Sequence, residues 1–579
     1  MNVNSYFSNT SARIGNIPRS GIDRSYRHHT TFNSGDLIPI FLDQWVLPGD
    51  TFTLDVNAFV RMSTPIHPVM DDAYIDINFF AIPYRLIWDD FETFMGAATD
   101  PSEWKNPREV IPPFIDLARP ESHGNVRKGS IIDFMGIPIN NPDDSDLTGP
   151  LPYVSALPPR AYCLVYNDWY RAEAFDEPLY IPKDSSTRPP IDPSAGESDQ
   201  DLDDIVMKAW TGCTKPAKVN KFFDYFTSAL PSPQRGEAVG IPISNPLLPV
   251  GSTNELIPSG IGLNTSALHS SGLSSDTFNI LGAYPGENSS SDNLNWYITD
   301  ANTYGNTPAT IDNLWSRLSA TNLGTINDLR TAIQIQKLLE ADSRGGTRYT
   351  SLIRSHFNIS SPDARLQRSE FLGGKRIRLS VTQVAQTSST DETSPQGNLA
   401  AYSLTSDSSS YVTYSATEHM IILGLACVRT KQTYSYGLEK QWSVRDRYDV
   451  YWPELANIGE LPIYNAEIWA YDSPLGVPQE SGIFGYNEAF AEYRYKPNLA
   501  TGAFRPQYKR SLDVWTYTSR FNERPSLSSE FLKQDVSNVD QTLAVQSSLE
   551  DQFIADFKFN YQMYRPMPLY SIPGQGSAI

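Results

Sequence analysis

The chain has few cysteines and no pattern that joins them. Its 579 residues include only Cys163, Cys213 and Cys427, which lie far apart and form no CxxC motif. An odd number of scattered cysteines argues against a disulfide framework and a zinc site, and favours a reducing compartment. The N-terminus lacks the apolar run of a signal peptide, and no stretch is apolar enough to cross a bilayer. We expect a protein made in a cytoplasm, without membrane insertion.

Basic residues are also scarce. Lys and Arg number 46 against 66 Asp and Glu, so the formal net charge is −20. A protein whose main task is to grip phosphates usually has the opposite sign. Residues 1–36 are a local exception, because they are polar, show little periodicity and carry several arginines. We interpret them as an extended basic arm, and its candidate nucleic-acid contacts are Arg13, Arg19, Arg24 and Arg27.

Enzyme motifs are missing as well. The sequence contains no GxxxxGK[ST], no GxGxxG after a strand, no HExxH and no GxSxG. The best carboxylate pair near aromatic residues is Glu488 and Glu492, which on a helix would share one face and could support glycosidase-type acid–base work. The alternative is that Glu492 forms ordinary ion pairs with Arg494 or Lys496. We favour the alternative and assign no catalytic residue.

Metal-ligand patterns are weak. His28 and His29 with His67 could bind a metal, but adjacent histidines rarely point the same way and no spaced partner is evident. The run Asp143–Asp146 lacks the spacing, the glycine and the final glutamate of a calcium loop. We expect no metal and no cofactor.

Aromatic residues and turn formers are plentiful. Phe, Trp and Tyr make up 12% of the chain, and it contains 43 Pro and 35 Gly. This composition favours strands joined by long loops. Alternating or continuous apolar patterns predict strands at both ends of the chain, as an antiparallel sandwich such as a jelly roll requires: 51–62, 73–83, 376–384, 420–429, 465–472 and 552–564. A capped, helix-periodic stretch predicts one helix over 325–346.

Residues 232–322 interrupt this pattern. They are rich in Gly, Ser, Asn and Pro, and ninety such residues are too many for a plain loop. We expect a surface insertion between two parts of a core, with boundaries at 1–36, 37–231, 232–322 and 323–579.

Several stretches alternate basic and aromatic residues, namely "RDRYDVYW", "FGYNEAFAEYRYKP" and "FRPQYKRSLDVW". Such stretches can hold single-stranded nucleic acid by stacking. They can also be buried in subunit contacts, where Tyr, Trp and Arg are enriched. The subunit contact is the preferred interpretation, and both uses remain open for different faces.

Long segments resemble the major capsid protein of gokushoviruses, which are single-stranded DNA phages of the Microviridae. The resemblance runs nearly end to end and is carried by the stretch at 327–374, by "TEHMIILGLACVRTKQTYSYGLEKQWSVRDRYDVYWPELANIGE", by "FGYNEAFAEYRYKPN" and by "RPMPLYSIPG". It implies an all-β fold, a single eight-stranded antiparallel jelly roll with long loops. It also implies sixty copies in a T=1 icosahedral shell around a circular single-stranded DNA genome.

The resemblance further implies a role for the insertion and a set of partners. Residues 232–322 would rise as a protrusion near the threefold axes and bind a host-cell receptor. The partners would be viral single-stranded DNA on the inner surface, a small basic DNA-binding protein and a DNA pilot protein. The virion would be the final location. Two other classes stay open from the residues alone: a soluble β-sandwich carbohydrate-binding protein or glycoside hydrolase, and a nucleic-acid-binding module.

Overall fold

The computed structural model describes most of the chain. The described residues are 19–97, 109–117, 126–185 without 142 and 148, 202–236, short strands between 250 and 316, 326–345, 355, and 368–570 without 386, 388–395, 398, 408–410 and 473–476. By its internal contacts the chain divides into one unit of residues 1–233 and 342–579 and a second unit of residues 234–341.

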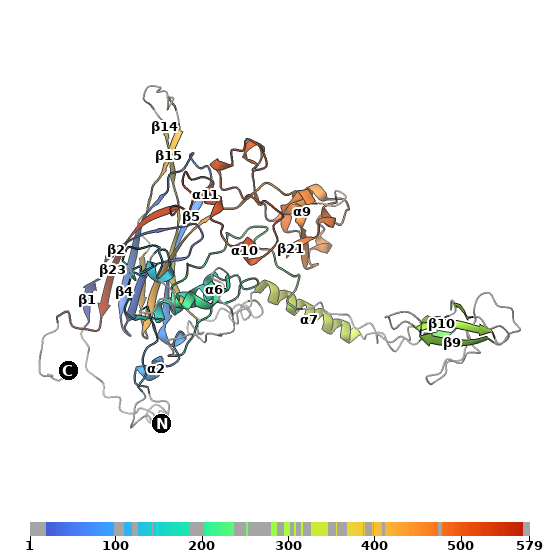
Figure 1. Cartoon of the computed structure of the whole chain (residues 1–579), viewed down its shortest axis with the longest axis horizontal. Coiled ribbons are helices and arrows are strands. Elements are labelled where there is room, and N and C mark those ends of the chain that lie inside the picture. The colour runs from blue at the N-terminus through green and yellow to red at the C-terminus, as the bar shows by residue number, and fades with distance from the viewer. Residues whose placement is uncertain are drawn as a thin grey trace. The chain divides into compact units, whose positions relative to one another are not determined.

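The first unit contains a six-stranded antiparallel sheet whose central strand comes from the C-terminal end of the chain. Strand β23 pairs on one side with β4 and on the other with β1 and β2, and β4 also pairs with β16 and β17. Figure 1 shows β23, drawn in red, among the blue strands of the N-terminal part. The strands are β1 (Ser20–Asp23), β2 (Tyr26–Phe32), β4 (Thr51–Met62), β16 (Thr405–Asp407), β17 (Tyr411–Ser415) and β23 (Phe553–Arg565).

A four-stranded antiparallel sheet lies against it, in the order β13-β5-β18-β3. Its strands are β3 (Ile38–Val46), β5 (Ala73–Pro83), β13 (Glu370–Arg378) and β18 (Met420–Thr430). Strand β18 is buried on both faces, as its continuous apolar run favours. Ile422 and Val428 belong to the core between the sheets, whereas Ile421 and Leu423 belong to a second core on the opposite face.

The core between the two sheets follows from the alternating pattern. In β4 the residues from Phe52 to Met62 that share one face are all buried, and the aromatic residues of β23 meet them. The rings of Phe41 and Phe559 lie 5.1 Å apart, and Phe41 also meets Phe79 edge-on. Each such side chain contributes roughly 1.5–3 kcal/mol on burial. Burial on one face therefore fixes the register of these strands.

The second core covers the outer face of the four-stranded sheet with short helices and loops. Helix α5 (Leu157–Val165) is the largest of these and contacts β3, β5 and β18. The Tyr162 hydroxyl donates to the carbonyl of Leu37 at 2.9 Å and accepts from the N–H of Ala217 at 3.0 Å. The other short elements of this region are α2 (Phe91–Phe94), α4 (Ile131–Phe134), α6 (Leu202–Lys208), β6 (Phe114–Ile115) and β7 (Val154–Ser155).

A third core supports a lobe built from residues 431–472 and 477–528. Its strands are β19 (Thr433–Tyr434), β20 (Glu460–Tyr464), β21 (Ile483–Glu488) and β22 (Asn498–Leu499), and α10 (Ser529–Leu532) and α11 (Ser537–Asp540) follow. The predicted strand over 465–472 is wrong. These residues form helix α9 (Asn465–Ile468) and a 3-10 turn, because the carboxylate of Glu467 caps the N–H of Tyr464 at 2.9 Å.

The predicted strand over 376–384 is two strands. Strand β13 ends at Arg378, and β14 (Val381–Ala385) forms a separate hairpin with β15 (Leu399–Ser403), which extends beyond the sheet in Figure 1. At the junction between β13 and β14, backbone groups form hydrogen bonds with side chains. The N–H of Ser380 donates to the Thr405 hydroxyl at 2.8 Å, and the Ser403 hydroxyl donates to the Ser380 carbonyl at 3.0 Å.

Part of the expected arm belongs to the six-stranded sheet. Residues 20–32 pair with β23 in one continuous register from Ser20 opposite Arg565 to Phe32 opposite Phe553. Phe32 is buried, which explains why these residues order on the sheet although their sequence shows little periodicity. Residues 1–18 lie outside the described residues.

The second unit contains helix α7 (Ile326–Gly345) up to residue 341, so the predicted helix is confirmed. It also contains a three-stranded sheet in the order β11-β10-β9 and the pair β12-β8. The strands are β8 (Val250–Ser252), β9 (Asn279–Pro285), β10 (Leu294–Asp300), β11 (Asn306–Pro308) and β12 (Leu314–Ser316). No helix among the described residues combines the length and the apolar character needed to cross a bilayer.

Candidate functional site

The structure describes three of the four candidate arginines, and these differ in their surroundings. Arg13 lies outside the described residues, and Arg19 is exposed ahead of β1. Arg24 reaches across to β3, where its guanidinium lies 2.6 Å from the carboxylate of Asp43, a group that also accepts from the Tyr561 hydroxyl at 2.7 Å. This contact gives Arg24 a role in the fold.

Arg27 remains on the outer face of β2. It lies 3.6 Å from Asp556 of β23, and the imidazole of His29 lies 3.5 Å from the same carboxylate. Both side chains are more than half exposed. Arg27 is therefore available to a partner on this face.

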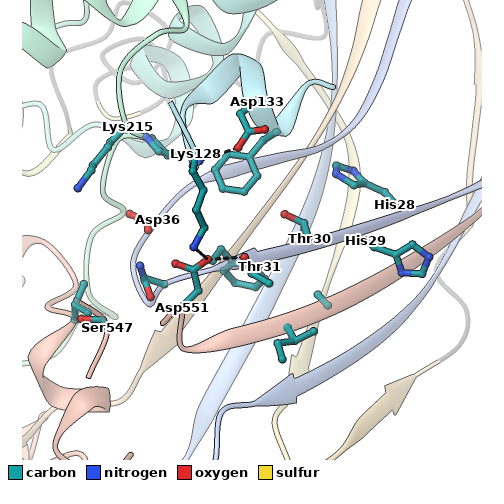
Figure 2. A pocket seen from close by; sticks show the side chains of 18 of the residues that line it. His28, His29, Thr30, Thr31, Asp36, Lys128, Asp133, Lys215, Ser547 and Asp551 are labelled. Atoms are coloured by element: carbon teal, nitrogen blue, oxygen red, sulfur yellow. Dashed lines mark hydrogen bonds and ion pairs between the residues drawn. The ribbon is translucent and has the colours of Figure 1, made fainter. Parts of the chain in front are cut away.

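A groove of about 1090 Å³ runs past β2 (Figure 2). Its walls come from four distant parts of the chain: 28–36 with 59–61, 128–134, 205–218, and 536–556. Figure 2 shows Lys128 reaching Asp551, which also accepts a hydrogen bond from Thr31. The sequence offered no local signal for this groove, because each of these four parts provides less than half of its lining residues.

Charges in the groove are balanced. It is lined by four cationic side chains, Arg61, Lys128, Lys215 and Lys218, and by four carboxylates, Asp36, Asp133, Asp551 and Asp556. Two of the carboxylates pair closely, Asp551 with Lys128 at 3.1 Å and Asp36 with Lys218 at 2.7 Å. Burial raises the pKa of Asp36 and of Asp133. The groove is thus polar without an excess of positive charge.

The histidines lie apart from one another. The ring of His28 hydrogen-bonds the carbonyl of Ile40 at 2.7 Å, and the ring of His67 stacks on Trp515 at 4.8 Å. Asp144 accepts from the backbone of Lys128 in a surface turn. Within the described ranges, no three His, Cys, Asp or Glu side chains are grouped to hold a metal ion.

The carboxylates of the "FGYNEAFAEYRYKP" stretch point to different partners. Glu488 ends β21 and pairs with Arg494 at 2.8 Å, whereas Glu492 lies in a 3-10 turn 3.9 Å from Lys440. Between them the chain reverses at Phe490, which has a φ of 58°. The expected common helix is therefore absent at this place.

Glu492 lines a small cavity with Glu467. The cavity holds about 60 Å³, and the Tyr225 hydroxyl donates to Glu467 at 2.8 Å. Burial raises the pKa of Glu467. Ligand pockets usually measure about 300–1,000 Å³, so this space is too small for a sugar ring and its neighbours.

The same lobe exposes many large aromatic side chains. We call the following set the aromatic surface: Trp442, Tyr448, Tyr451, Trp452, Tyr493 and Tyr495. The exposed fraction is 78% for Trp442 and between 46% and 61% for the others. Tyr448, Tyr493 and Val444 also line a hollow of about 150 Å³. Exposed aromatic side chains gathered in one lobe are typical of interaction sites.

Sequence reasoning found part of this surface. "RDRYDVYW" and "FGYNEAFAEYRYKP" were singled out for their aromatic and basic residues, and the structure brings them together at Tyr451, which contacts the rings of Phe490 and Tyr493. Trp442 was missed, although it is the most exposed member. Its signal was a tryptophan in a mostly polar stretch, "LEKQWSVR", which lacks the apolar periodicity of a buried strand or helix.

Taken together, a β-rich unit and many exposed aromatic side chains in one lobe are typical of a protein that works by association. Comparison with known proteins identifies the class. Residues 11–575 match the family described as Capsid protein (F protein). The chain belongs to this family, whose members are structural capsid proteins and not enzymes.

Three curated relatives are similar over nearly the whole chain, and each is a capsid protein VP1. The protein of Chlamydia phage 1 is 36% identical and that of Bdellovibrio phage phiMH2K 37% identical. That of Spiroplasma virus 4 is 38% identical. Each comparison covers 96% of this chain and 95–96% of the relative. The resemblance drawn from the sequence is thus confirmed, and the protein is a major capsid protein of a Microviridae phage of the gokushovirus group.

Proposed function

We propose that sixty copies of this chain form a T=1 icosahedral shell around a circular single-stranded DNA genome. The family supports self-association into a shell. The aromatic surface is the observation that carries the proposal for this chain. A shell subunit must bury large areas with anchors that lose little conformational entropy, and Tyr and Trp meet that need.

The strand order supports an eight-stranded jelly roll for each subunit. Counting β1 with β2 and β16 with β17 as single strands, the two sheets have the chain orders 1-8-3-6 and 2-7-4-5. The first and last strands are neighbours, as in the double-sheet jelly rolls of viral capsids. The hairpin β14–β15 and the loops over the second core are additions to this framework.

The aromatic surface is proposed to contact a second copy. We expect Trp442→Ser to leave the folded subunit almost unchanged, since Trp442 is 78% exposed. We expect it to weaken assembly by about 2 kcal/mol per contact or more, which raises the concentration needed for shells roughly thirtyfold. Sedimentation of the expressed protein measures the shells, and circular dichroism measures the fold.

Leu549→Ser is the matched control. Leu549 is equally exposed, at 79%, but lies outside the aromatic surface. Both variants should show the same melting temperature within a few degrees, and only Trp442→Ser should lose shells. Normal shells from Trp442→Ser would show that this surface faces solvent in the particle.

The proposal also includes the DNA, the other phage proteins and the host receptor as partners. Arg13, Arg19 and Arg27 would face viral DNA, with Arg24 held by Asp43. A small basic DNA-binding protein and a DNA pilot protein of the same phage would share the interior, which an acidic coat makes plausible on charge grounds. Residues 232–322 would form the threefold protrusions and bind a host receptor. Assembly would take place in the bacterial cytoplasm.

A further inference from the structure

Strand β2 has an open edge. Among the described residues it pairs only with β23, in a register that continues from β1 without a shift. The N–H of Arg24 donates to the carbonyl of Tyr561 at 2.9 Å. With this register, the even-numbered residues of β2 form the backbone hydrogen bonds to β23. In an antiparallel ladder these residues alternate with residues whose backbone groups point away. Arg27, His29 and Thr31 therefore direct their N–H and C=O groups to the free edge.

The groove follows this edge. Its lining includes His28, His29, Thr30, Thr31, Phe32 and Asn33 in unbroken succession. Neighbouring residues of a strand face opposite sides of the sheet, so a cavity that touches all of them must run along the strand's edge. Figure 2 shows His28 and His29 turned to different sides and the loop that carries Lys128 as the opposite wall. An exposed edge beside an open groove is a template for another strand.

The charge of the groove favours a peptide over a nucleic acid. Four cations face four carboxylates, and Lys128 and Lys218 are engaged by Asp551 and Asp36. A polyanion needs an excess of positive charge. A peptide backbone needs N–H and C=O partners, which the edge of β2 offers.

We propose that residues 1–18 of a second copy add as a strand along the edge of β2. The inference rests on the proposed shell, which brings copies close to one another. At about 3.3 Å per residue the segment can reach roughly 60 Å. It has no proline before Pro18, so it can donate along its length, and Val3, Tyr6, Phe7 and Ile14 are strand formers. Main-chain hydrogen bonds would provide the affinity, as in other strand additions.

Amide hydrogen exchange on wild-type particles tests the proposal without a variant. In assembled shells we expect the amides of Arg27, His29 and Thr31 to exchange about 100-fold more slowly than in free subunits. The slow exchange should persist in shells emptied of DNA. If these amides lose their protection when the DNA is removed, the edge of β2 is covered by nucleic acid. If they are already protected in free subunits, the edge is covered by another part of the same copy. Either result overturns the proposal.

A photo-reactive benzoylphenylalanine at Phe7 identifies the segment. Cross-links to residues 26–33 that form in shells and not in free subunits support an arm from another copy. Shells in which Phe7 cross-links only elsewhere overturn it. Wild-type protein that forms no shell would instead refute the proposed function, so the two failures are distinguishable.

A pair of variants at one position tests the role of the backbone. His29→Pro removes an outward N–H that β23 does not use, and edge strands accept proline. His29→Ala keeps this N–H and reports the loss of the side chain alone. We expect His29→Pro to reduce the yield of shells at least tenfold relative to His29→Ala, with equal melting temperatures of the free subunits. Equal yields would mean that the edge is unused.

Discussion

Glu488 and Glu492 show how a pattern of residues can suggest chemistry that the backbone does not support. Their spacing would place both carboxylates on one face of a helix. The chain instead leaves β21 at Glu488 and reverses at Phe490, so the two side chains find separate cations, Arg494 and Lys440. No shared substrate position remains between them, and both serve the local fold.

We therefore expect Glu488→Gln to have little effect. Its ion pair with Arg494 is about half exposed on both sides, and such pairs contribute about 0–1 kcal/mol. Thermal unfolding and shell yield should both stay close to wild type, and no glycan hydrolysis should depend on this residue. Loss of turnover of a glycan with assembly intact would contradict the structural role assigned here.

Lys221 is a buried cation whose protonation affects stability. Its side chain is 7% exposed, and its ammonium donates to the Phe531 carbonyl at 2.7 Å. Burial lowers the pKa of Lys221 from 10.5 to about 8, although nearby Asp535 and Asp224 act in the opposite direction. Between about pH 8 and 10.5 the unfolded chain holds this proton more tightly than the folded chain. Stability should therefore rise with pH in this window, and below it the cost of the buried charge is fully present.

Lys221→Met should thus be more stable than wild type at pH 7, by about 1–2 kcal/mol after the lost hydrogen bond is counted. The difference in melting temperature should shrink as the pH is raised to 10. Lys509→Met, at an exposed position, is the control and should show no such trend. A constant difference for Lys221→Met across this range would mean that the ammonium is not destabilised by burial.

At the scale of elements, strands with one buried face could be predicted from the sequence. The places where the chain departs from such a strand could not. The alternation at 51–62 and at 552–564 led directly to β4 and β23, since burial on one face imposes a period of two. The stretch 465–472 has the composition of a strand, but a single carboxylate cap made it a helix. The break at Ser380 depends on hydroxyls about 25 residues away.

The groove beside β2 could not be predicted for a related reason. Its walls meet only after the sheet has formed, because Thr31 and Asp551 are separated by 520 positions in the chain. The aromatic surface was partly predictable, because stretches that alternate aromatic and basic residues in the sequence are typical of contact surfaces. The periodicity of the segments indicated an antiparallel sandwich with strands from both ends of the chain, whereas the eight-stranded jelly roll came from the resemblance.

The insertion is the element whose removal is most informative. The second unit, residues 234–341, begins two residues after the predicted start of the insertion and includes helix α7 up to its boundary. Replacing residues 237–322 by a short Gly/Ser linker should be tolerated, because loop-closure entropy depends weakly on length. We expect such shells to form and to lose adsorption to host cells. Electron microscopy and a cell-binding assay measure the two outcomes separately.

A variant with wild-type adsorption would refute the role in host recognition. The control is a linker of the same composition inserted in the polar segment 388–395, which lies between β14 and β15 in the sequence; this change leaves the insertion in place. This control should form shells and adsorb normally.

At the scale of the whole molecule, the acidic charge of the chain suits binding between copies better than binding to DNA. Copies that each carry a net charge of −20 repel one another at long range, so we propose that binding between copies comes mainly from apolar and backbone groups. The aromatic surface and the open edge of β2 provide one of each kind. Weakening either should disturb assembly before it disturbs the fold of a subunit.

The position of β23 also affects how the protein is made. Strand β4 ends at Met62 and its neighbour β23 begins at Phe553, so 490 residues are translated between them. At about 5–20 residues per second a ribosome needs roughly 25–100 s for this interval. During that time the sheet of the nascent chain lacks the strand that pairs with β4, and its apolar face stays uncovered. A ribosome that stops early releases a product without its central strand, and such a product cannot close the core or enter a particle. Only fully translated chains can therefore complete the six-stranded sheet.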